Sequence, residues 1–211
     1  MSGDDLGILG VLREPVRRVL YDYVAAQGRD VSRDEAAEAA GVQRTLAAFH
    51  LDKLVEAGLL DQAFRRLSGR TGPGSGRPAK VYRRSAAEHQ VSLPPRDYRT
   101  LALVLAEAVE ALGGEEAAEA AARRAGERVS APGLREALTE RGYEPYDDDG
   151  RIRLRNCPFH VLAEERPVLV CAMNLALCQG LLSALPGDRH TARMDPRPGE
   201  CCVTFSKTNE D

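Results

Sequence analysis

Cysteine is the residue type with the most distinctive chemistry in this 211-residue chain, and its five copies all lie in the C-terminal third. Cys157, Cys171 and the adjacent pair Cys201 and Cys202 fall where one predicted element meets the next. Thiolates are soft ligands that suit an iron–sulfur cluster, Zn²⁺ or Cu⁺. The fifth copy, Cys178, lies in the apolar run NLALCQGLL, which indicates a buried core residue.

The spacing of the cysteines limits how they can share a ligand. Cys171 and Cys178 are seven residues apart on a predicted helix, so they share a face about 10 Å apart, too far for one metal ion but not for a larger cluster. Cys201 and Cys202 are neighbours on a predicted strand, and their side chains should point to opposite faces. Only one of that pair is therefore expected beside Cys157 and Cys171. The chain has no CxxC pairs, which argues against a zinc ribbon.

The elements that must position the cysteines form a small mixed domain. Its hydrophobic pattern predicts both short helices and short strands. The acidic run DDDG lacks the ligand spacing of a calcium loop, so we interpret it as a solvated hairpin turn. The predicted elements are a helix over 132–141, a hairpin over 143–154, helices over 158–165 and 167–185, and strands over 190–195 and 201–205.

A second candidate site lies in residues 31–60, which predict two helices joined by a tight turn. Ser32 is a good N-cap for the first helix, and Glu35 three residues later completes a capping box. Gly41 ends that helix, since glycine adopts a left-handed conformation at little cost. The second helix begins at Gln43 and is long enough to lie in a groove of duplex DNA.

The second helix has an apolar face at helical spacing and an opposite face that is mostly polar. Polar side chains on such a helix can contact base edges and phosphates. The predicted apolar face comprises Leu46, Phe49, Leu51, Leu54 and Val55. The opposite face carries Ala48 and the predicted DNA-contacting residues, which are Gln43, Arg44, Thr45, His50 and Lys53.

A basic hairpin follows this helix. Residues 61–84 hold seven bases against one acid, and the Gly/Pro/Ser-rich stretch over 68–78 predicts a tip between two strands. Such a hairpin can clamp phosphates or enter the minor groove. A basic hairpin placed after a candidate recognition helix is the wing of a winged helix. Its predicted DNA contacts are Arg70, Arg77 and Lys80.

Residues 8–84 resemble an ArsR-like winged helix–turn–helix repressor domain. The resemblance rests on REPVRRVLYDYV as the first helix, AAFHLDKLVEAGLL as the recognition helix and GRPAKVYR as the far side of the wing. It implies a repressor that binds double-stranded DNA. His50 is typical of that family at its place, where a structural or backbone-contacting role is commoner than a metal-binding one.

Residues 140–205 resemble the SufR-like iron–sulfur transcriptional regulators, through NCPFHVLAEERPVLVCAMNLAL followed by GECCV. In that family three cysteines hold the cluster, so the resemblance implies an iron–sulfur cluster here, of the [4Fe-4S] type. The long interval before the cysteine pair departs from the family's pattern and leaves the third and fourth ligands open. The ligands carried over are Cys157, Cys171 and Cys201, with Cys202 as the alternative to Cys201 and His160 as a candidate fourth.

Residues 96–112 and 115–129 predict two helices, the second rich in alanine. In repressors of the resembled architecture such helices pair two subunits, and DNA half-sites one helical turn apart call for a two-fold dimer. We therefore expect a homodimer. The alternative is a helical pair within one chain.

Charge is unevenly distributed along the chain. The net charge of −3 divides into 14 bases and 11 acids in residues 1–85, 7 and 14 in 86–150, and 8 and 7 in 151–211. A basic segment suited to DNA binding is thus followed by an acidic segment. No apolar run approaches a membrane span and the N-terminus lacks signal-peptide features, so a cytoplasmic protein without membrane contact is expected. In that reducing compartment the cysteines should not form structural disulfides.

The sequence therefore predicts an α+β protein with a winged helix–turn–helix domain over 1–85, linker and dimerisation helices over 86–130, and a cysteine-containing sensor domain over 131–211. Its predicted function is a DNA-binding repressor whose operator affinity is set by the cluster. The alternative is a winged-helix repressor that responds to thiol oxidation, to Zn²⁺ or Cu⁺, or to a small organic effector. No enzymatic activity is expected, because the cysteines and His160 form no convincing nucleophile–base set.

Overall fold

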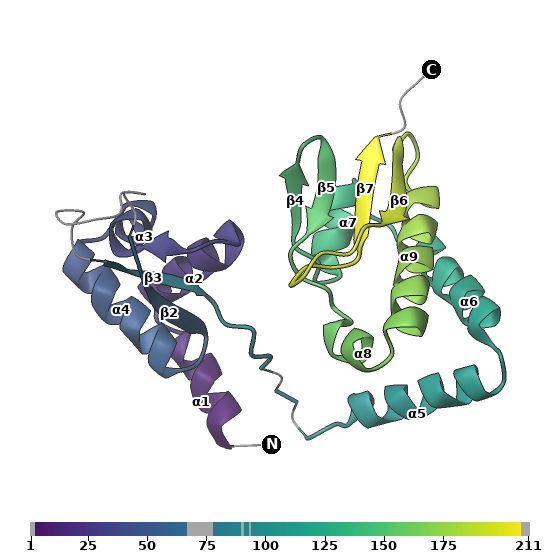
Figure 1. The fold of residues 1–211 in the computed structure, drawn as a ribbon, viewed down its shortest axis with the longest axis horizontal. Helices are drawn as coiled ribbons and strands as arrows, with labels where there is room; N and C mark the ends of the chain where they lie inside the picture. Colours follow the sequence, from purple (N-terminus) through teal and green to yellow (C-terminus); the bar gives the residue numbers. More distant parts are fainter. Residues whose placement is uncertain (1–2, 67–77, 90, 93, 208–211) are drawn as a thin grey trace. The chain divides into compact units, whose positions relative to one another are not determined.

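The computed structural model describes residues 3–66, 78–89, 91–92 and 94–207, and for residues 3–6 the backbone alone. The structure mixes helices and sheets, in agreement with the α+β prediction, and divides into two compact units, Met1–Arg96 and Asp97–Asp211 (Figure 1). Both helices predicted to form a dimerisation segment lie inside the second unit. No helix in the described part of the chain is long and apolar enough to cross a membrane.

The first unit combines four helices with a three-stranded antiparallel sheet in its described residues. The third strand lies between the first two and pairs with the second along its whole length, as the two sides of a wing would. The tip predicted over 68–78 lies almost entirely outside the described residues. The elements are α1 (Gly3–Val11), α2 (Pro15–Gln27), β1 (Val31–Ser32), α3 (Arg33–Ala40), α4 (Arg44–Glu56), β2 (Leu60–Arg65) and β3 (Ala79–Arg84).

The N-terminal segment forms two helices, and the second of them, α2, corresponds to the predicted helix REPVRRVLYDYV. The Glu14 carboxylate accepts a hydrogen bond from the backbone N–H of Arg17 at 2.7 Å, and Pro15 occupies the first turn of α2. Proline is well tolerated there because its missing N–H would have no partner within the helix. These two residues start a new helix, so α1 ends before them.

The third helix is capped at both ends as predicted. The Ser32 hydroxyl accepts from the backbone N–H of Glu35 at 3.2 Å, and the Glu35 carboxylate accepts in return from the backbone of Ser32. Gly41 ends the helix at a φ of 63°. Arg29 and the Tyr23 hydroxyl also donate to Glu35, at 2.5 and 3.1 Å, and the guanidinium holds the pKa of that carboxyl below its usual range.

The second unit is built on a four-stranded antiparallel sheet in the order β4-β5-β7-β6. The long helix α9 packs on β6 and β7, and α7 packs on β4 and on α9 (Figure 1). Its core includes the fully buried Tyr143, Leu154 and Phe205. The elements are α5 (Tyr98–Ala111), α6 (Glu115–Glu127), α7 (Leu134–Glu140), β4 (Pro145–Asp148), β5 (Arg151–Leu154), α8 (His160–Glu165), α9 (Pro167–Ser183), β6 (His190–Met194) and β7 (Val203–Lys207).

The two hairpins of this sheet follow the sequence pattern with one correction. The acidic turn was predicted correctly: β4 and β5 are joined by Asp149 and Gly150, both at positive φ, as tight hairpin turns require. The second hairpin pairs β6 with β7, but β7 begins at Val203. Cys201 and Cys202 were predicted to lie on that strand and instead lie directly before it.

The helix α6 packs along α9 within the same chain, at a crossing that two glycines permit. A Cβ atom on Gly126 would meet the backbone of Leu177 and Leu181, and one on Gly180 would meet the carbonyl oxygen of Arg123. Neither position has room for a larger residue. The structure therefore gives α6 the intramolecular partner that was the alternative to a subunit contact.

In the described part of the chain, no element covers the outer face of the preceding helix, α5. None of its residues is buried, and Leu101, Val104 and Leu105 are each more than half exposed. The homodimer remains a prediction that this apolar face supports.

Candidate functional site

The second helix of the tight-turn pair, α4, presents a polar end to solvent. Gln43, Arg44 and Thr45 are all exposed, and Lys53 is partly exposed further along the helix. The Nε atom of Arg44 lies 2.5 Å from Oδ1 of Asp34, and both side chains are largely exposed. An ion pair as exposed as this is weak. Arg44 can therefore exchange Asp34 for a base edge or a phosphate.

The buried face of α4 agrees with the predicted one only in part, because Leu51 and Leu54 are buried as predicted but the rest of the face is rotated. Leu46 and Phe49, predicted to face the core, are 42% and 55% exposed, whereas Ala47 and His50 are buried. The Nδ1 atom of His50 lies 3.6 Å from the carboxylate of Glu14, at the start of α2. The His50 ring is therefore held in the core against α2, which favours a structural role for this residue over the predicted DNA contact.

A series of polar contacts fixes the wing strand β3 against α3 and α4. The Nζ atom of Lys80 lies 2.6 Å from Oδ1 of Asp52, and the Tyr82 hydroxyl donates to the same oxygen at 2.8 Å. Arg33 Nε donates to the Tyr82 hydroxyl at 2.9 Å. Burial and the Asp52 charge raise the pKa of Tyr82 to about 12. Lys80, predicted to contact DNA, is thus engaged with α4 and helps to orient the wing.

Two other arginines of the wing form ion pairs with the same carboxylate, that of Asp30. Arg65 on β2 and Arg83 on β3 each pair with Asp30, through Nε at 3.1 and 3.2 Å. Both guanidinium side chains stay more than half exposed, so they add positive charge to the wing surface. The predicted DNA contacts Arg70 and Arg77 lie outside the described residues.

Comparison with known families decides what this arrangement is. Residues 12–63, from the end of α1 into β2, match the family model of a helix-turn-helix domain, and that family includes ArsR-like regulators. This stretch is a helix–turn–helix domain. Its presence marks the chain as a DNA-binding regulator, with α3 and α4 as the two helices of the motif. No curated protein and no solved structure matches the chain.

Outside the helix–turn–helix domain, four cysteines come together in the second unit. We call Cys157, Cys171, Cys201 and Cys202 the thiol site. Cys157 lies between β5 and α8, Cys171 lies on α9, and the pair precedes β7. The Sγ atoms of Cys171 and Cys202 are 3.5 Å apart. The sequence predicted that only one member of the pair would lie here; both do, because they precede the strand and escape its alternation of faces.

Asn174 on α9 contacts two sulfur atoms of the thiol site, those of Cys157 and Cys201. Its Nδ2 atom lies 3.2 Å from Sγ of Cys201 and 4.0 Å from Sγ of Cys157, and its Oδ1 atom accepts a hydrogen bond from the buried Tyr143 hydroxyl. The side chain is 2% exposed. Sequence reasoning missed Asn174, although an amide three residues after Cys171 in the apolar run VLVCAMNLAL was a usable signal.

The thiols of the site influence one another's ionisation. A hydrogen bond from Cys157, supported by the amide of Asn174 and by backbone N–H groups, lowers the pKa of Cys201 although burial opposes this. The same hydrogen bond, together with burial, raises the pKa of Cys157. Burial and the neighbouring Cys202 raise the pKa of Cys171. Cys201 therefore ionises more readily than Cys157 and Cys171.

Backbone bonds and ion pairs hold the cysteine pair in place. The N–H of Cys201 donates to a carbonyl of β5 at 3.0 Å, and the carbonyl of Cys202 accepts from the N–H of Asp195 at 2.8 Å. The fully buried Arg153 reaches the carboxylates on both sides of the turn, Asp195 at 2.6 Å and Glu200 at 2.9 Å. The turn that positions Cys201 and Cys202 is thus anchored to β5.

Two residues discussed above, Cys178 and His160, do not belong to the thiol site. Cys178 is a core residue, as predicted: it is 1% exposed, and burial raises its pKa to about 12. His160, the candidate fourth ligand, is 57% exposed and pairs with Glu164 at 3.3 Å, so the structure does not bring it into the thiol site. Among the described residues, no group of three or more cysteine, histidine, aspartate or glutamate side chains is arranged to hold a metal ion.

Proposed function

We propose that this DNA-binding regulator is a repressor whose operator affinity depends on an iron–sulfur cluster, of the [4Fe-4S] type, held by the thiol site. The observation that carries the proposal is the convergence of four cysteines from three separate segments of the second unit. A single buried cysteine is an ordinary core residue, as Cys178 illustrates. Here Cys171 contacts Cys202, and Cys157 and Cys201 share the amide of Asn174, which is more contact among thiols than packing requires.

The chemistry of the donors suits such a cluster. Cysteine thiolates are the usual ligands of [4Fe-4S] clusters, and hydrogen bonds to the sulfur atoms tune them. Asn174 offers that hydrogen bond, with Nδ2 already 3.2 Å from the sulfur of Cys201. When bound, the group would make the site sensitive to iron supply and to oxidants.

The four cysteines can act on the fold by tying segments together. Held by a common group, they join α9 to the segments that precede α8 and β7. Without that connection, each segment keeps only its own contacts, such as the bonds of Arg153. The second unit then has two arrangements of different free energy, which is what coupling between a sensor and a DNA-binding domain requires.

The direct test of the proposal is to purify the full chain without oxygen and to measure iron, sulfide and visible absorbance. We expect stoichiometric iron and sulfide and a band at about 400 nm, typical of iron bound by thiolates. Operator affinity should change at least about tenfold when the iron is removed with a chelator, a coupling of ordinary size. Protein that stays colourless after anaerobic reconstitution would rule the cluster out.

One observation favours a second candidate, a thiol switch. Cys171 and Cys202 have sulfur atoms 3.5 Å apart, close enough to form a disulfide after a small movement. With hydrogen peroxide as oxidant, the two thiols would form one S–S bond and the peroxide would be reduced to two water molecules. Protein without iron that changes operator affinity on peroxide treatment, and recovers it with a thiol reductant, would support this candidate over the cluster.

The exposed N-terminal end of α4 should read base edges. We expect Arg44→Ala to weaken binding to an operator selected from random sequences by about 5- to 150-fold, the loss of one base-edge contact. Binding to random DNA should fall much less. Lys53→Ala should weaken both alike and reduce the salt dependence by about one unit of slope, as a lost phosphate contact does. Equal losses for the two variants on both DNAs would contradict the assignment of Arg44.

We propose that the repressor is a homodimer joined through the outer face of α5. Apolar side chains along that face are between 56% and 85% exposed, and a second copy would cover them. Two-fold symmetry also matches DNA half-sites one helical turn apart. Light scattering decides the matter: the expected mass is twice the 22.9 kDa of one chain. A mass of one chain at micromolar concentration would exclude the dimer. The apolar face comprises Tyr98, Leu101, Val104, Leu105 and Leu112.

A further inference from the structure

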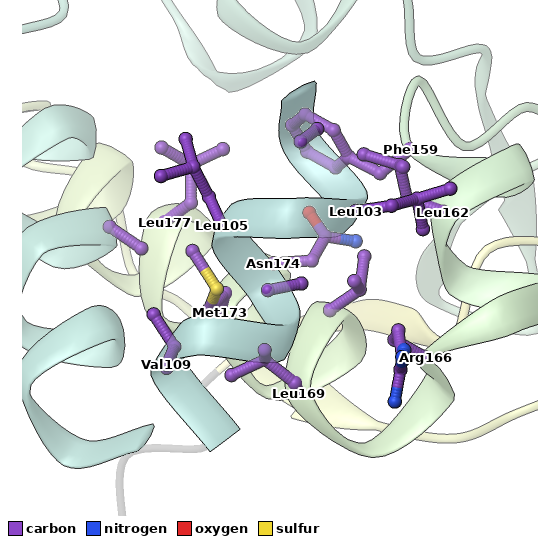
Figure 2. Close-up of a pocket in the computed structure, with 14 residues that line it drawn as sticks. Leu103, Leu105, Val109, Phe159, Leu162, Arg166, Leu169, Met173, Asn174 and Leu177 are labelled. Atoms are coloured by element: carbon purple, nitrogen blue, oxygen red, sulfur yellow. The ribbon is translucent and has the colours of Figure 1, made fainter. Parts of the chain in front are cut away.

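The second unit contains a cavity outside the helix–turn–helix domain, and one of its lining residues, Asn174, also contacts the thiol site. It has a volume of about 400 Å³ and lies between α5 on one side and α8 and α9 on the other (Figure 2). Its lining is apolar apart from two side chains, Arg166 and Asn174. The apolar lining includes Leu103, Val109, Leu162, Leu169 and Met173.

The helix α5 covers this cavity without packing closely on the helices beneath it. Its inner side chains line the cavity, yet no residue of the helix is buried. Ion pairs hold it near both ends, between Arg99 and Glu165 and between Glu110 and Arg166, the latter at 2.8 Å. The helix is therefore fixed over an apolar space that its own side chains do not fill.

The polar groups at the wall are already engaged. Arg166 is neutralised by Glu110, and Glu107 lies 4.0 Å away as a second acid. The amide of Asn174 bonds to Tyr143 through its oxygen and to Cys201 through its nitrogen. A charged ligand would have to break one of these contacts, so the wall favours a neutral one.

We propose that the cavity binds a neutral, apolar small molecule, aromatic or branched aliphatic. Pockets for small molecules commonly enclose about 300–1,000 Å³ and are lined mainly by apolar side chains. An apolar cavity of about 150 Å³ holds benzene, so about 400 Å³ suits a molecule of roughly 15 non-hydrogen atoms. This proposal does not depend on the cluster.

A small molecule fits this site better than a second copy of the chain. The cavity is bounded by side chains of α5, α6, α8 and α9 of one chain. The outer face of α5, with Leu101, Val104 and Leu112, is a separate surface, and only Leu105 borders both. Covering the outer face would leave most of the cavity wall unfilled.

A molecule bound in the cavity would change the position of two parts of the unit that matter for regulation. Asn174 is part of the cavity wall and also contacts the thiol site. The helix α5 is the first element after the boundary that ends the DNA-binding unit at Arg96. A bound apolar molecule would stabilise one position of α5 and of Asn174, and so act as an effector.

The test uses the full chain and N-phenyl-1-naphthylamine, a neutral apolar fluorophore of about the right size whose emission rises in apolar surroundings. We expect saturable binding of about one molecule per chain. Ala106→Phe and Ala102→Phe place a ring in the cavity, because both alanines line it, and each should weaken binding at least about tenfold. The control Ala121→Phe adds the same ring to an exposed position on α6, outside the lining, and should leave binding unchanged.

Circular dichroism and iron content, measured on every variant, separate loss of the pocket from loss of the fold or of the thiol site. Absence of saturable binding by the wild type would overturn the proposal, as would equal binding by folded Ala106→Phe and Ala102→Phe proteins. Light scattering tests whether the cavity is instead part of a subunit interface. If the fluorophore dissociates a dimer, or if the filling variants do so, the cavity belongs to a subunit interface and the small-molecule proposal fails.

Discussion

Serine in place of Cys157 or of Cys171 is expected to remove iron, sulfide and visible absorbance from the protein purified without oxygen. A serine hydroxyl has nearly the size of a thiol, but it is a hard donor and does not ionise near neutral pH, so it is a poor ligand for iron in a cluster. The same loss is expected from at least one of Cys201→Ser and Cys202→Ser. Iron and sulfide analysis, with absorbance at about 400 nm, measures it.

The matched control is Cys178→Ala, because Cys178 lies on the same helix as Cys171 but in the core. We expect this variant to keep its iron, although removing a buried sulfur lowers its stability. If only one of Cys201→Ser and Cys202→Ser loses iron, the result identifies which member of the pair is the ligand. Iron retained by Cys157→Ser and by Cys171→Ser alike would contradict the proposed site.

Alanine in place of Gly180 or Gly126 is expected to cause the largest loss of stability in the second unit. Each added Cβ would fall on backbone atoms of the facing helix, so neither a rotamer change nor a flexible side chain can relieve the clash. The cost should reach the upper end for overpacking, about 3 kcal/mol, and lower the unfolding temperature by about 10 °C. Calorimetry of the full chain measures this effect.

Gly10→Ala provides the control for these substitutions. Gly10 also lies in a helix, α1, but a Cβ atom there would meet nothing within 4 Å. We expect it to leave stability unchanged or to raise it by about 0.5–1 kcal/mol, since alanine is the better helix former. If Gly180→Ala unfolds at the wild-type temperature, the close crossing of α6 and α9 is wrong.

The helix α9 is the element that connects the features of the second unit. Cys171 and Asn174 place it at the thiol site, Leu169 and Met173 at the cavity, and Gly180 at the crossing with α6. Its low exposure follows from these roles. A shift of α9 along its axis would change all three contacts, so it is the element through which we expect a signal in the second unit to travel.

Some features of the fold depend on neighbours in the sequence and were predicted from it. Ser32, Glu35 and Gly41 specify the start and end of α3 through caps that act within a few residues. The hairpin turn at Asp149 and Gly150 is equally local, because it needs only two residues that accept positive φ. The α+β class and the helix–turn–helix domain follow from patterns of this kind.

The orientation of α4 could not be settled in the same way. At about 100° per residue, the five residues of the predicted apolar face spread over about two thirds of the helix circumference, so they cannot all be buried at once. Packing chose the face with the small Ala47 and with His50, and left Leu46 and Phe49 exposed. Which face is buried depends on the shape of α2 and α3 opposite it, and that information lies outside the helix itself.

The sequence by itself determined that the chain begins with a DNA-binding helix–turn–helix domain and that its cysteines are concentrated in another part. Tertiary structure alone decided that Cys202 lies beside Cys171, that Asn174 joins Cys157 to Cys201, and that α6 packs on α9. The physical reason is the range of the interactions. Caps and turns are made between residues a few positions apart, whereas these contacts join residues up to 56 positions apart that only the packed sheet and helices bring together.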